Sequence, residues 1–299
     1  MGVDYSKISI TAKLVAYFRQ FSDIPFAGEV AEYVQAREAL VEIARKLDER
    51  VDLQNVDGEL PKEGKIYAPL LEARYKSIVQ LIRRTGTDQV FELASGFSLR
   101  GLAMSAASEI TYLESDLPGI NEEKKKLLAD LMAKQNLTGL DRHHIINANA
   151  LDYTEIEAAI PLLSRDRPLV VINEGLLNYL SADERSVVAG NVRELLSNFP
   201  GGAWITPDFT TRSIADNVSE TTKRFRRAVM GVTERQLNEA AFEDEEAIDT
   251  FVRDSGFSQV SYYQADEVPH LSSLERLGLS PEIITHMRPR MRIWLLSPQ

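Results

Sequence analysis

The sequence predicts an α/β fold built on a mostly parallel sheet, and three observations lead to this prediction. Short apolar runs alternate with helix-compatible segments between residues 88 and 207. The residues before this region are mainly helical in pattern, and the chain closes with two strand-like runs that have little helix between them. Alternating strands and helices form parallel sheets with helices on both faces, whereas a closing pair without a crossover helix favours an antiparallel end.

Residues 1–87 are predicted to form an N-terminal helical cap. Thr11–Phe18, Glu29–Leu47 and Leu70–Arg84 place apolar residues at helical spacing. Pro25 interrupts the pattern between the first two segments, because proline cannot continue a helix that has already begun. Val51–Lys65 is polar, contains an Asp-Gly pair and a proline, and is predicted to form loops.

The core is predicted to comprise residues 88–207 and 243–299. Its strand-like runs are short and apolar: Gln89–Leu93, Ile110–Leu113, His144–Ala148, Leu169–Asn173, Ala203–Thr206, Ser258–Gln264 and Arg290–Leu296. Its helical segments are Leu99–Ser108, Asn121–Gln135, Tyr153–Leu163, Ala182–Asn198 and Glu245–Ser255, whereas Ala265–Pro289 is irregular. In sheets of this kind, ligands bind beyond the carboxyl ends of the strands, near the point where the strand order reverses.

Residues 208–242 are predicted to form a lid insertion within this single domain of residues 1–299. The segment is polar and helix-compatible, and an insertion at this point would sit over the carboxyl edge of the sheet. It contains a basic cluster: Lys223, Arg224, Arg226 and Arg227. The cluster is interpreted as a solvated face of the lid, and a substrate clamp is the alternative.

The composition restricts the classes of function. The 299 residues, 44% of them hydrophobic, suffice for one large domain, and the net charge of −11 disfavours nucleic acid or an anionic membrane as the main partner. The absence of cysteine excludes disulfides, thiolate metal sites and a thiolate nucleophile. No secretory signal or membrane-spanning stretch is found, so we expect a cytoplasmic protein. No metal site is predicted, and the sequence carries no signal for the oligomeric state.

Small residues, acidic residues and one leucine end or follow four consecutive predicted strands. They are Glu92, Ala94 and Gly96 after the first strand, Asp116 after the second, Leu151 and Asp152 after the third, and Glu174 after the fourth. Because the carboxyl ends of parallel strands meet at one edge, these residues are expected to share one crevice. A turn of small residues lets a ligand approach the backbone, and a carboxylate after the next strand is typical of a nucleoside site.

The chemistry of this crevice suits S-adenosylmethionine better than a dinucleotide. The ribose diol needs a carboxylate that accepts two hydrogen bonds, and the adenine ring needs apolar walls. The methionine ammonium needs acceptors, and its carboxylate needs a cation. The turn ASGFS lacks the full G-x-G-x-x-G pattern of a pyrophosphate site. The crevice is therefore interpreted as a methionine-adenosine site.

Each of these residues also has a structural interpretation. Glu92 can accept backbone hydrogen bonds in a turn, whereas Asp116 and Asp152 can each cap the helix that follows. Glu174 ends an apolar strand, where a carboxylate needs a partner or a ligand. Cations on helices are usually solvated, and a tyrosine after a strand is as readily part of the core.

The chain resembles the leucine carboxyl methyltransferase family, which includes bacterial polyketide O-methyltransferases. The resemblance is carried by ELASGFSLR after the first strand, TYLESDLPGINEEKKKLL after the second and INEGLLNYLS after the fourth. TAKLVAYFR and YAPLLEARY also resemble family elements that close over the cofactor, and the resemblance runs from about residue 8 to residue 296. It implies a class I methyltransferase fold, a Rossmann-like sheet whose last strand is antiparallel.

The resemblance implies roles at the nucleoside end of the cofactor. Asp116 would bind the ribose hydroxyls, and Leu151 and Asp152 would flank the adenine. Gly96 would admit the methionine part of the cofactor against the backbone. The family turn is commonly Gly-x-Gly, and Ala94 takes its first position here. Alanine has less φ freedom than glycine, so we expect a slightly altered turn.

The resemblance also implies roles at the methionine end. Arg74 would pair with the cofactor carboxylate, with Lys13 as a second cation. Glu174 would face the methionine ammonium or the reaction centre, with Tyr179 nearby, and these two are the predicted catalytic residues. Glu92 is expected in the same crevice.

The predicted function is methyl transfer from S-adenosylmethionine to a hydroxyl or carboxyl oxygen of a small molecule. The leaving group is already activated, so alignment and desolvation are the main contributions of the enzyme. A carboxylate acceptor needs no base, whereas a phenol or an alcohol must lose its proton. No clear base is found: His143 and His144 begin a strand, and His270 and His286 lie in the late irregular segment, from which His270 could reach the crevice.

Three alternatives stay open. A protein methyltransferase acting on a C-terminal leucine would need a lid that admits a protein tail. A non-catalytic protein would bind S-adenosylmethionine without turnover. A nicotinamide-dependent reductase is disfavoured by the incomplete glycine pattern and by the antiparallel end of the sheet.

Overall fold

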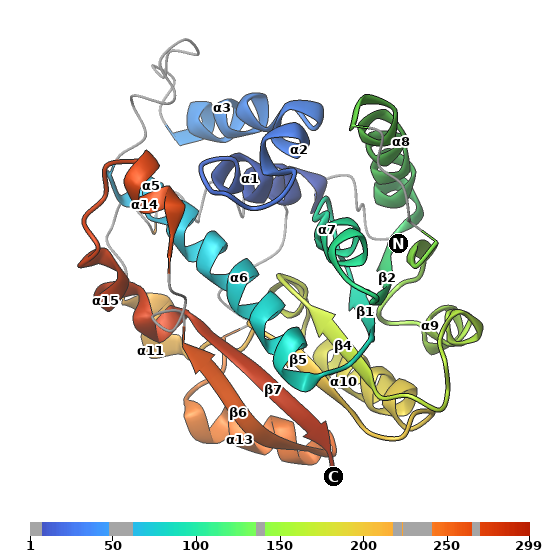
Figure 1. Cartoon of the computed structure of the whole chain (residues 1–299). Helices are drawn as coiled ribbons and strands as arrows, with labels where there is room; N and C mark the ends of the chain where they lie inside the picture. Colours follow the sequence, from blue (N-terminus) through green and yellow to red (C-terminus); the bar gives the residue numbers. More distant parts are fainter. Residues whose placement is uncertain (1–7, 48–61, 136–140, 218–222, 224–240, 265–269) are drawn as a thin grey trace.

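The computed structural model describes residues 8–47, 62–135, 141–217, 223, 241–264 and 270–299. Within these residues, a 7-stranded sheet with the order β3-β2-β1-β4-β5-β7-β6 forms the centre of the molecule, and helices cover both of its faces (Figure 1). The strand order reverses between β1 and β4, which lie side by side. The predicted α/β class is confirmed.

The sheet is parallel except at one edge. Its strands are β1 (Gln89–Leu93), β2 (Thr111–Asp116), β3 (His143–Asn147), β4 (Leu169–Asn173), β5 (Gly202–Thr206), β6 (Phe257–Gln264) and β7 (Arg292–Pro298). β1 to β5 pair in parallel, whereas β7 runs antiparallel to both β5 and β6, so the antiparallel last strand is confirmed. β2 differs from its prediction because it continues to Asp116, which places Glu114 inside the strand.

Two layers of helices bury the two faces of the sheet. One layer contains α6 (Tyr67–Thr85) and α7 (Arg100–Ala107), and the other contains α9 (Tyr153–Glu157), η2 (Ile160–Leu162), α10 (Ala182–Leu196) and α13 (Glu245–Asp254). Ile82 belongs to the first core cluster with Val90, and Val188 belongs to the second with Phe91. Every residue of β1 and β4 is buried, as expected for parallel strands that are covered on both sides.

The N-terminal helices form a third group, which packs against the core. They are α1 (Ile8–Arg19), α2 (Ala27–Tyr33), α3 (Ala36–Leu47) and α5 (Lys62–Lys65), and α8 (Pro118–Gln135) from the core adjoins them (Figure 1). The continuous helix predicted over Glu29–Leu47 is broken, because Gln35 takes a left-handed conformation with φ 53°. Lys62–Lys65 is helical instead of a loop, and residues 48–61 lie outside the described chain.

Short helices occupy several of the connections after β4. They are η3 (Leu177–Tyr179), α11 (Arg212–Asp216), α14 (Ser272–Arg276), α15 (Ile283–Met287) and η6 (Arg288–Arg290). A backbone bridge between Thr211 and Phe242 joins the chain near the two ends of the predicted lid. Phe242 N donates to Thr210 O at 2.9 Å, and Arg212 N donates to Phe242 O at 2.8 Å. Most of its interior, including Arg224, Arg226 and Arg227, lies outside the described residues.

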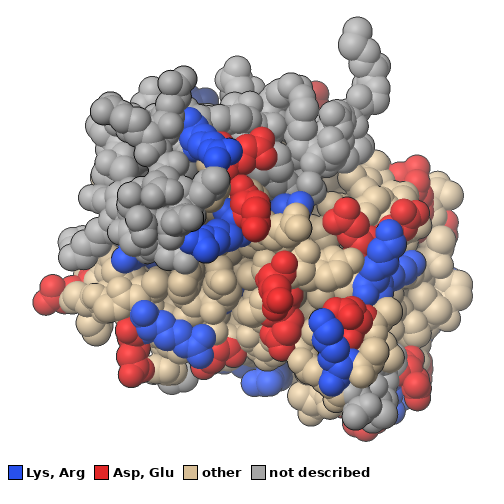
Figure 2. Space-filling model, turned by 90° about the horizontal axis from the view of Figure 1, so that it is seen from above, with Lys and Arg blue, Asp and Glu red and all other residues tan. Residues whose placement is uncertain are grey.

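One face of the described chain mixes both signs of charge (Figure 2). Seen from above, acidic and basic side chains lie among one another across the coloured part of the face (Figure 2). None of the helices in the described ranges is long and apolar enough to cross a membrane.

Candidate functional site

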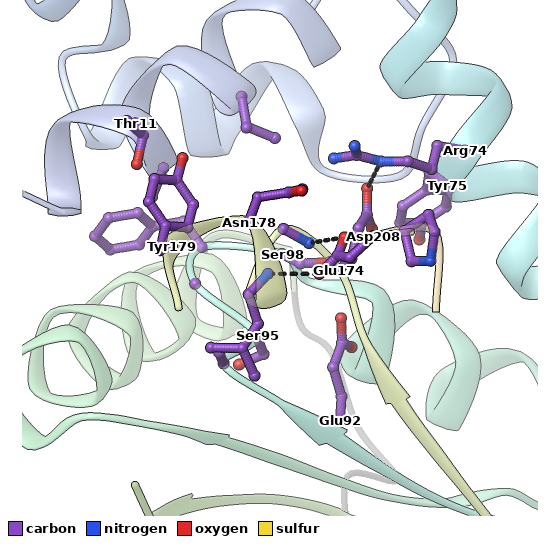
Figure 3. A pocket seen from close by; sticks show the side chains of 18 of the residues that line it. Thr11, Arg74, Tyr75, Glu92, Ser95, Ser98, Glu174, Asn178, Tyr179 and Asp208 are labelled. Carbon is purple, nitrogen blue, oxygen red and sulfur yellow. Dashed lines mark hydrogen bonds and ion pairs between the residues drawn. The ribbon is translucent and has the colours of Figure 1, made fainter. Parts of the chain in front are cut away.

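A cavity of about 450 Å³ lies at the carboxyl ends of β1 to β4, with α1 forming part of its wall. The sequence-predicted residues that line it are Arg74, Glu92, Ala94, Gly96, Asp116, Leu151, Glu174 and Tyr179. Thr11 and Tyr179 lie at one end of the close-up view, and Arg74, Tyr75 and Glu174 lie at the other (Figure 3). The fold therefore brings most of the predicted site residues into one cavity.

The turn after β1 forms one wall and is held by Asp116. Ala94 and Gly96 both have left-handed conformations, with φ 51° and 54°. Gly96 N donates to Asp116 Oδ2 at 2.7 Å, and Leu117 N donates to Asp116 Oδ1 at 2.8 Å. Burial raises the pKa of Asp116. Asp116 thus stabilises the turn by accepting these two hydrogen bonds. Asp116 also lines the cavity, where a diol can donate to its carboxylate.

A buried ion pair supports this turn from below. Lys124 Nζ lies 2.5 Å from Glu114 Oε2 and donates to Ser95 Oγ at 2.9 Å. Glu114 Oε1 accepts from Gly101 N at 2.9 Å, and a Cβ at Gly101 would lie only 2.5 Å from that oxygen. Burial acts to raise the pKa of Glu114, but Lys124 and His143 outweigh it and lower the pKa to about 2. Glu114 therefore supports the turn instead of facing a ligand.

Glu174 is the centre of a buried arginine cluster. Arg19 Nη2 and Arg74 Nε donate to Glu174 Oε1 at 2.5 and 2.8 Å, and Arg100 Nη2 donates to Oε2. Burial acts to raise the pKa of Glu174, but the three guanidinium groups hold it well below its usual range. A carboxylate stabilised in this way is a poor proton acceptor, so the predicted catalytic role of Glu174 is not that of a base.

The cluster extends to Glu92 and Tyr75. Arg100 Nη1 donates to Glu92 Oε1 at 2.5 Å, and burial raises the pKa of Glu92. The guanidinium groups of Arg19 and Arg100 lie over the Tyr75 ring, 5.4 and 4.7 Å from its centroid. Three guanidinium groups meet two carboxylates, so the cluster keeps one excess positive charge when both carboxylates are ionised.

Two arginines of this cluster are absent from the sequence prediction. Arg19 lies in TAKLVAYFR and Arg100 lies in ELASGFSLR, both of which carry the family resemblance. The periodicity of α1 indicates only that Arg19 is near the end of a helix, where basic residues are common. Glu174 lies 155 residues from Arg19. No local pattern could therefore have paired the two residues.

Asp208 is also absent from the sequence prediction. It holds the loop that carries Glu174 and Tyr179. Its carboxylate lines the cavity and accepts from the backbone N–H groups of Gly175, Leu176 and Leu177 and from the Asn173 side chain, all at 2.7–2.9 Å. Burial raises the pKa of Asp208 and that of Tyr179, and the Tyr179 side chain forms a hydrogen bond with Thr11.

Lys13 and Asp152 lie outside the lining of this cavity. Asp152 is exposed and caps α9, because its Oδ1 accepts from Thr154 N at 2.9 Å. Asn149 lines the cavity instead, next to Leu151, whose N–H donates to Asn149 Oδ1 at 3.0 Å. Lys13 lies on α1, and Arg19 of the same helix provides a cation at the cavity.

The three histidines whose side chains the structure describes lie outside the cavity lining as well. His143 and His144 begin β3, and His143 Nε2 lies 3.3 Å from Glu114 Oε2. His270 is exposed, and its carbonyl accepts from Lys76 Nζ at 3.0 Å. The side chain of His286 lies outside the described part of the chain. The sequence left open that His270 could reach the crevice, and in the structure His270 is not among the lining residues.

Comparison with known proteins gives one family and a common fold. The family described as leucine carboxyl methyltransferase matches residues 20–192. A search of curated proteins gave no match. A candidate methyltransferase from Thermobifida fusca is 14% identical, with 88% of each chain covered and a TM-score of 0.55.

Two further solved structures match this chain. The pyocyanin biosynthetic protein PhzM is 14% identical, with 95% of this chain and 73% of that chain covered and a TM-score of 0.50. Magnesium protoporphyrin IX methyltransferase from Synechocystis with bound SAH is also 14% identical, with 88% and 96% covered and a TM-score of 0.48. At these identities the likeness is one of fold.

Proposed function

The chain belongs to the leucine carboxyl methyltransferase family, and we propose that it methylates an oxygen atom of a small molecule. S-Adenosylmethionine is the methyl donor of this family and the cofactor of this chain. The bound cofactor supplies a methyl group on a sulfonium, which leaves readily as a neutral thioether. The chain's own residues bind and orient the two reactants and exclude water from them.

The donor set of the cavity fits this cofactor. Asp116 would accept hydrogen bonds from the ribose hydroxyls, the side chain of Leu151 would flank the adenine, and Gly96 would admit the methionine part. The excess positive charge of the arginine cluster suits the methionine carboxylate. Arg19 adds a specific observation: its buried Nε has no hydrogen-bond partner among the described residues, and Arg19 lines the cavity. Arg19 and Arg74 are therefore the cations proposed to receive that carboxylate.

The polar groups of the cavity favour an acceptor that is already an anion. Among the described lining residues there is no histidine, lysine or cysteine, and each carboxylate has donors of its own. Burial raises the pKa of Tyr75 to about 12, and the pKa of Tyr179 is raised as well, so neither phenol is a base at neutral pH. A carboxylate acceptor needs no proton removal, and we propose a methyl ester as the product.

The absence of a free base from the described lining carries this proposal, and product chemistry tests it. The full chain is incubated with methyl-labelled S-adenosylmethionine and matched panels of carboxylic acids, phenols and peptides ending in leucine. We expect labelled products from the acids that alkali hydrolyses to methanol. Alkali-stable ethers would contradict the ester. Selective labelling of the peptides would favour a protein acceptor, and cofactor binding without any turnover would favour a binding protein.

Cofactor binding is measured separately by isothermal titration. Asp116→Ala removes a charged acceptor, so it should weaken binding of S-adenosylhomocysteine by about 10- to 100-fold, or about 1.5–3 kcal/mol. Asp130→Ala is the matched control, because Asp130 is exposed on α8 and pairs with Lys134. No binding by well-folded wild type would contradict the proposed function, and unchanged affinity in Asp116→Ala would contradict the ribose role.

A further inference from the structure

The loop between β4 and α10 is folded around the carboxylate of Asp208. Asp208 Oδ1 accepts from Gly175 N at 2.8 Å, and Oδ2 accepts from Leu176 N and Leu177 N at 2.8 and 2.9 Å. Gly175 has a left-handed conformation with φ 79°, which turns these three consecutive N–H groups toward one point. Such a concave arrangement of backbone N–H groups binds anions, and here a side chain of the protein fills it.

The same loop carries the residues that face the rest of the cavity. Glu174 binds Arg19 of α1 and Arg74 of α6, and Tyr179 forms its hydrogen bond with Thr11 of α1. The loop is thus held by α1 and α6 through its side chains, and by Asp208, which follows β5 in the chain, through its backbone N–H groups. Asp208 is 3% exposed.

We propose that Asp208 is a positioning residue of the methyl-transfer site, which fixes the loop 174–179 so that Glu174 and Tyr179 meet the reactants. The proposal rests on the proposed function, because it assumes that these two side chains face the cofactor and the acceptor. Asp208 itself takes no part in bond making. Its role is to satisfy three N–H groups that burial would otherwise leave without acceptors.

A carboxylate suits this place better than an amide. An ionised carboxylate has two oxygens and only accepts, which matches the four N–H donors around Asp208. Asparagine has the same shape but one oxygen, and its NH₂ group would point toward other donors. Asp208→Asn therefore removes acceptors from the loop with little change in volume.

A tryptophan reports on this network. Trp204 Nε1 donates to Asn173 Oδ1 at 2.7 Å, and Asn173 Nδ2 donates to Asp208 Oδ2 at 2.7 Å. The sequence contains two tryptophans, Trp204 and Trp294, so two indole resonances are expected in an NMR spectrum. Trp294→Phe assigns them. A change in the hydrogen bonds at Asp208 should shift the resonance of Trp204.

The experiment compares Asp208→Asn with wild type in the full chain. We expect the amides of residues 175–177 to exchange with solvent at least about tenfold faster, because they lose their acceptor. The indole resonance of Trp204 should shift. With the acceptor identified in the product assay, kcat should fall by about 100-fold with a smaller change in KM, which is the scale expected from misplaced reacting groups. Asp244→Asn is the matched control: Asp244 caps α13, and Oδ1 accepts from Ala247 N at 2.9 Å.

Gly175→Ala is the second variant, in case Asp208→Asn does not fold. It leaves Asp208 intact, and nothing lies within 4 Å of the added Cβ, but it strains the left-handed turn. Slower turnover and faster exchange at residues 175–177 are again expected. If Asp208→Asn folds and both its kcat and the amide exchange of residues 175–177 are unchanged, the proposal is overturned. If only Gly175→Ala folds, the same result in that variant overturns it. Failure of wild type to bind S-adenosylmethionine would instead overturn the proposed function, because amide exchange tests the loop without turnover.

Discussion

At the scale of single residues, Ala94 holds a backbone conformation that suits glycine. Its φ of 51° is close to the 54° of Gly96 two positions later. A side chain with a Cβ is strained in this region by about 1–2 kcal/mol. The bonds from Ser95 N to Ser115 O and from Gly96 N to Asp116 keep the turn in place despite this strain.

Ala94→Gly should therefore stabilise the protein. We expect the free energy of unfolding to rise by about 1 kcal/mol, because relief of strain exceeds the added flexibility of the unfolded chain. Urea denaturation measures the change. Ala103→Gly, inside α7, should lower the same quantity by about 1 kcal/mol, since glycine is a poor helix former. A less stable Ala94→Gly protein would show that the turn carries no strain.

Glu114 should make the protein sensitive to acid. Its pKa in the folded state is about 2, below the ordinary value of 4.5. Its stabilising contribution is therefore fully present above about pH 4.5 and is lost as the pH falls toward 2. Glu114→Gln should be less stable at neutral pH and should depend less on pH in this window, as urea midpoints at a series of pH values would show. Glu109→Gln, on the exposed surface, should keep the wild-type slope.

At the scale of elements, α1 contributes both to the cavity wall and to a core cluster. The residues of this helix that line the cavity are Thr11, Ala12, Val15, Ala16 and Arg19. Ala12, Val15 and Arg19 are three and four residues apart, which places them on one face of the helix. Leu14, Tyr17 and Phe18 are buried in the cluster that joins α1 to α3 and α8. A Cβ at Gly96 would lie 3.8 Å from that of Ala12, so α1 lies directly over the turn after β1.

Ala12→Trp should fill the space between α1 and this turn. We expect S-adenosylhomocysteine to bind about 10- to 100-fold more weakly, which corresponds to the 1–3 kcal/mol typical of overpacking. Lys13→Trp is the matched control, because Lys13 is the next residue of α1 and lies outside the cavity lining. Isothermal titration gives both affinities. Equal affinities in the two variants would show that α1 does not limit the site.

At the scale of the whole molecule, the cavity joins two parts of the chain that lie far apart in sequence. Its arginine cluster takes Arg19 from α1 and Arg74 from α6, and Glu92, Arg100 and Glu174 from the sheet and its first crossover helix. A ligand held by both parts stabilises the folded state as a unit, because it binds only where both are in place.

S-Adenosylhomocysteine should therefore stabilise both parts together. At a concentration 100 times its Kd, we expect a gain of about 2.7 kcal/mol in the free energy of unfolding. Thermal denaturation measures the gain, and hydrogen exchange should slow both in α1 and in the turn after β1. Protection of the turn alone would contradict a shared site. Adenosine, which lacks the amino acid part, should protect α1 less.

The sheet could be predicted from the sequence because its central strands are short, continuous apolar runs. The acidic strand ends were also visible, since Glu92 lies near the end of such a run, Asp116 comes three residues after one and Glu174 follows one directly. Their partners were not, because Arg19 and Arg100 meet Glu174 only after the chain has folded. Asp208 was hidden for the same reason, since its donors lie more than 30 residues away.

The remaining differences between the sequence prediction and the structure have separate causes. Asp152 has a helix beginning at the next residue, and a backbone N–H within reach makes it a cap. Gln35 breaks a helix whose apolar spacing continues past it, because its conformation depends on how α2 and α3 pack against α1. The helical pattern of α1 does not distinguish Lys13 from Arg19 as the cation of the cavity.

The backbone bridge between Thr211 and Phe242 has a consequence for how such proteins diversify. The chain leaves the sheet region and returns to it at neighbouring residues, and Phe209, Phe242 and Phe251 stack together beside that point. A segment whose two ends are already joined can change in length at little entropic cost to the rest of the protein. A change in chain length between Asn217 and Ala241, in evolution or by design, therefore leaves the described lining of the cavity in place.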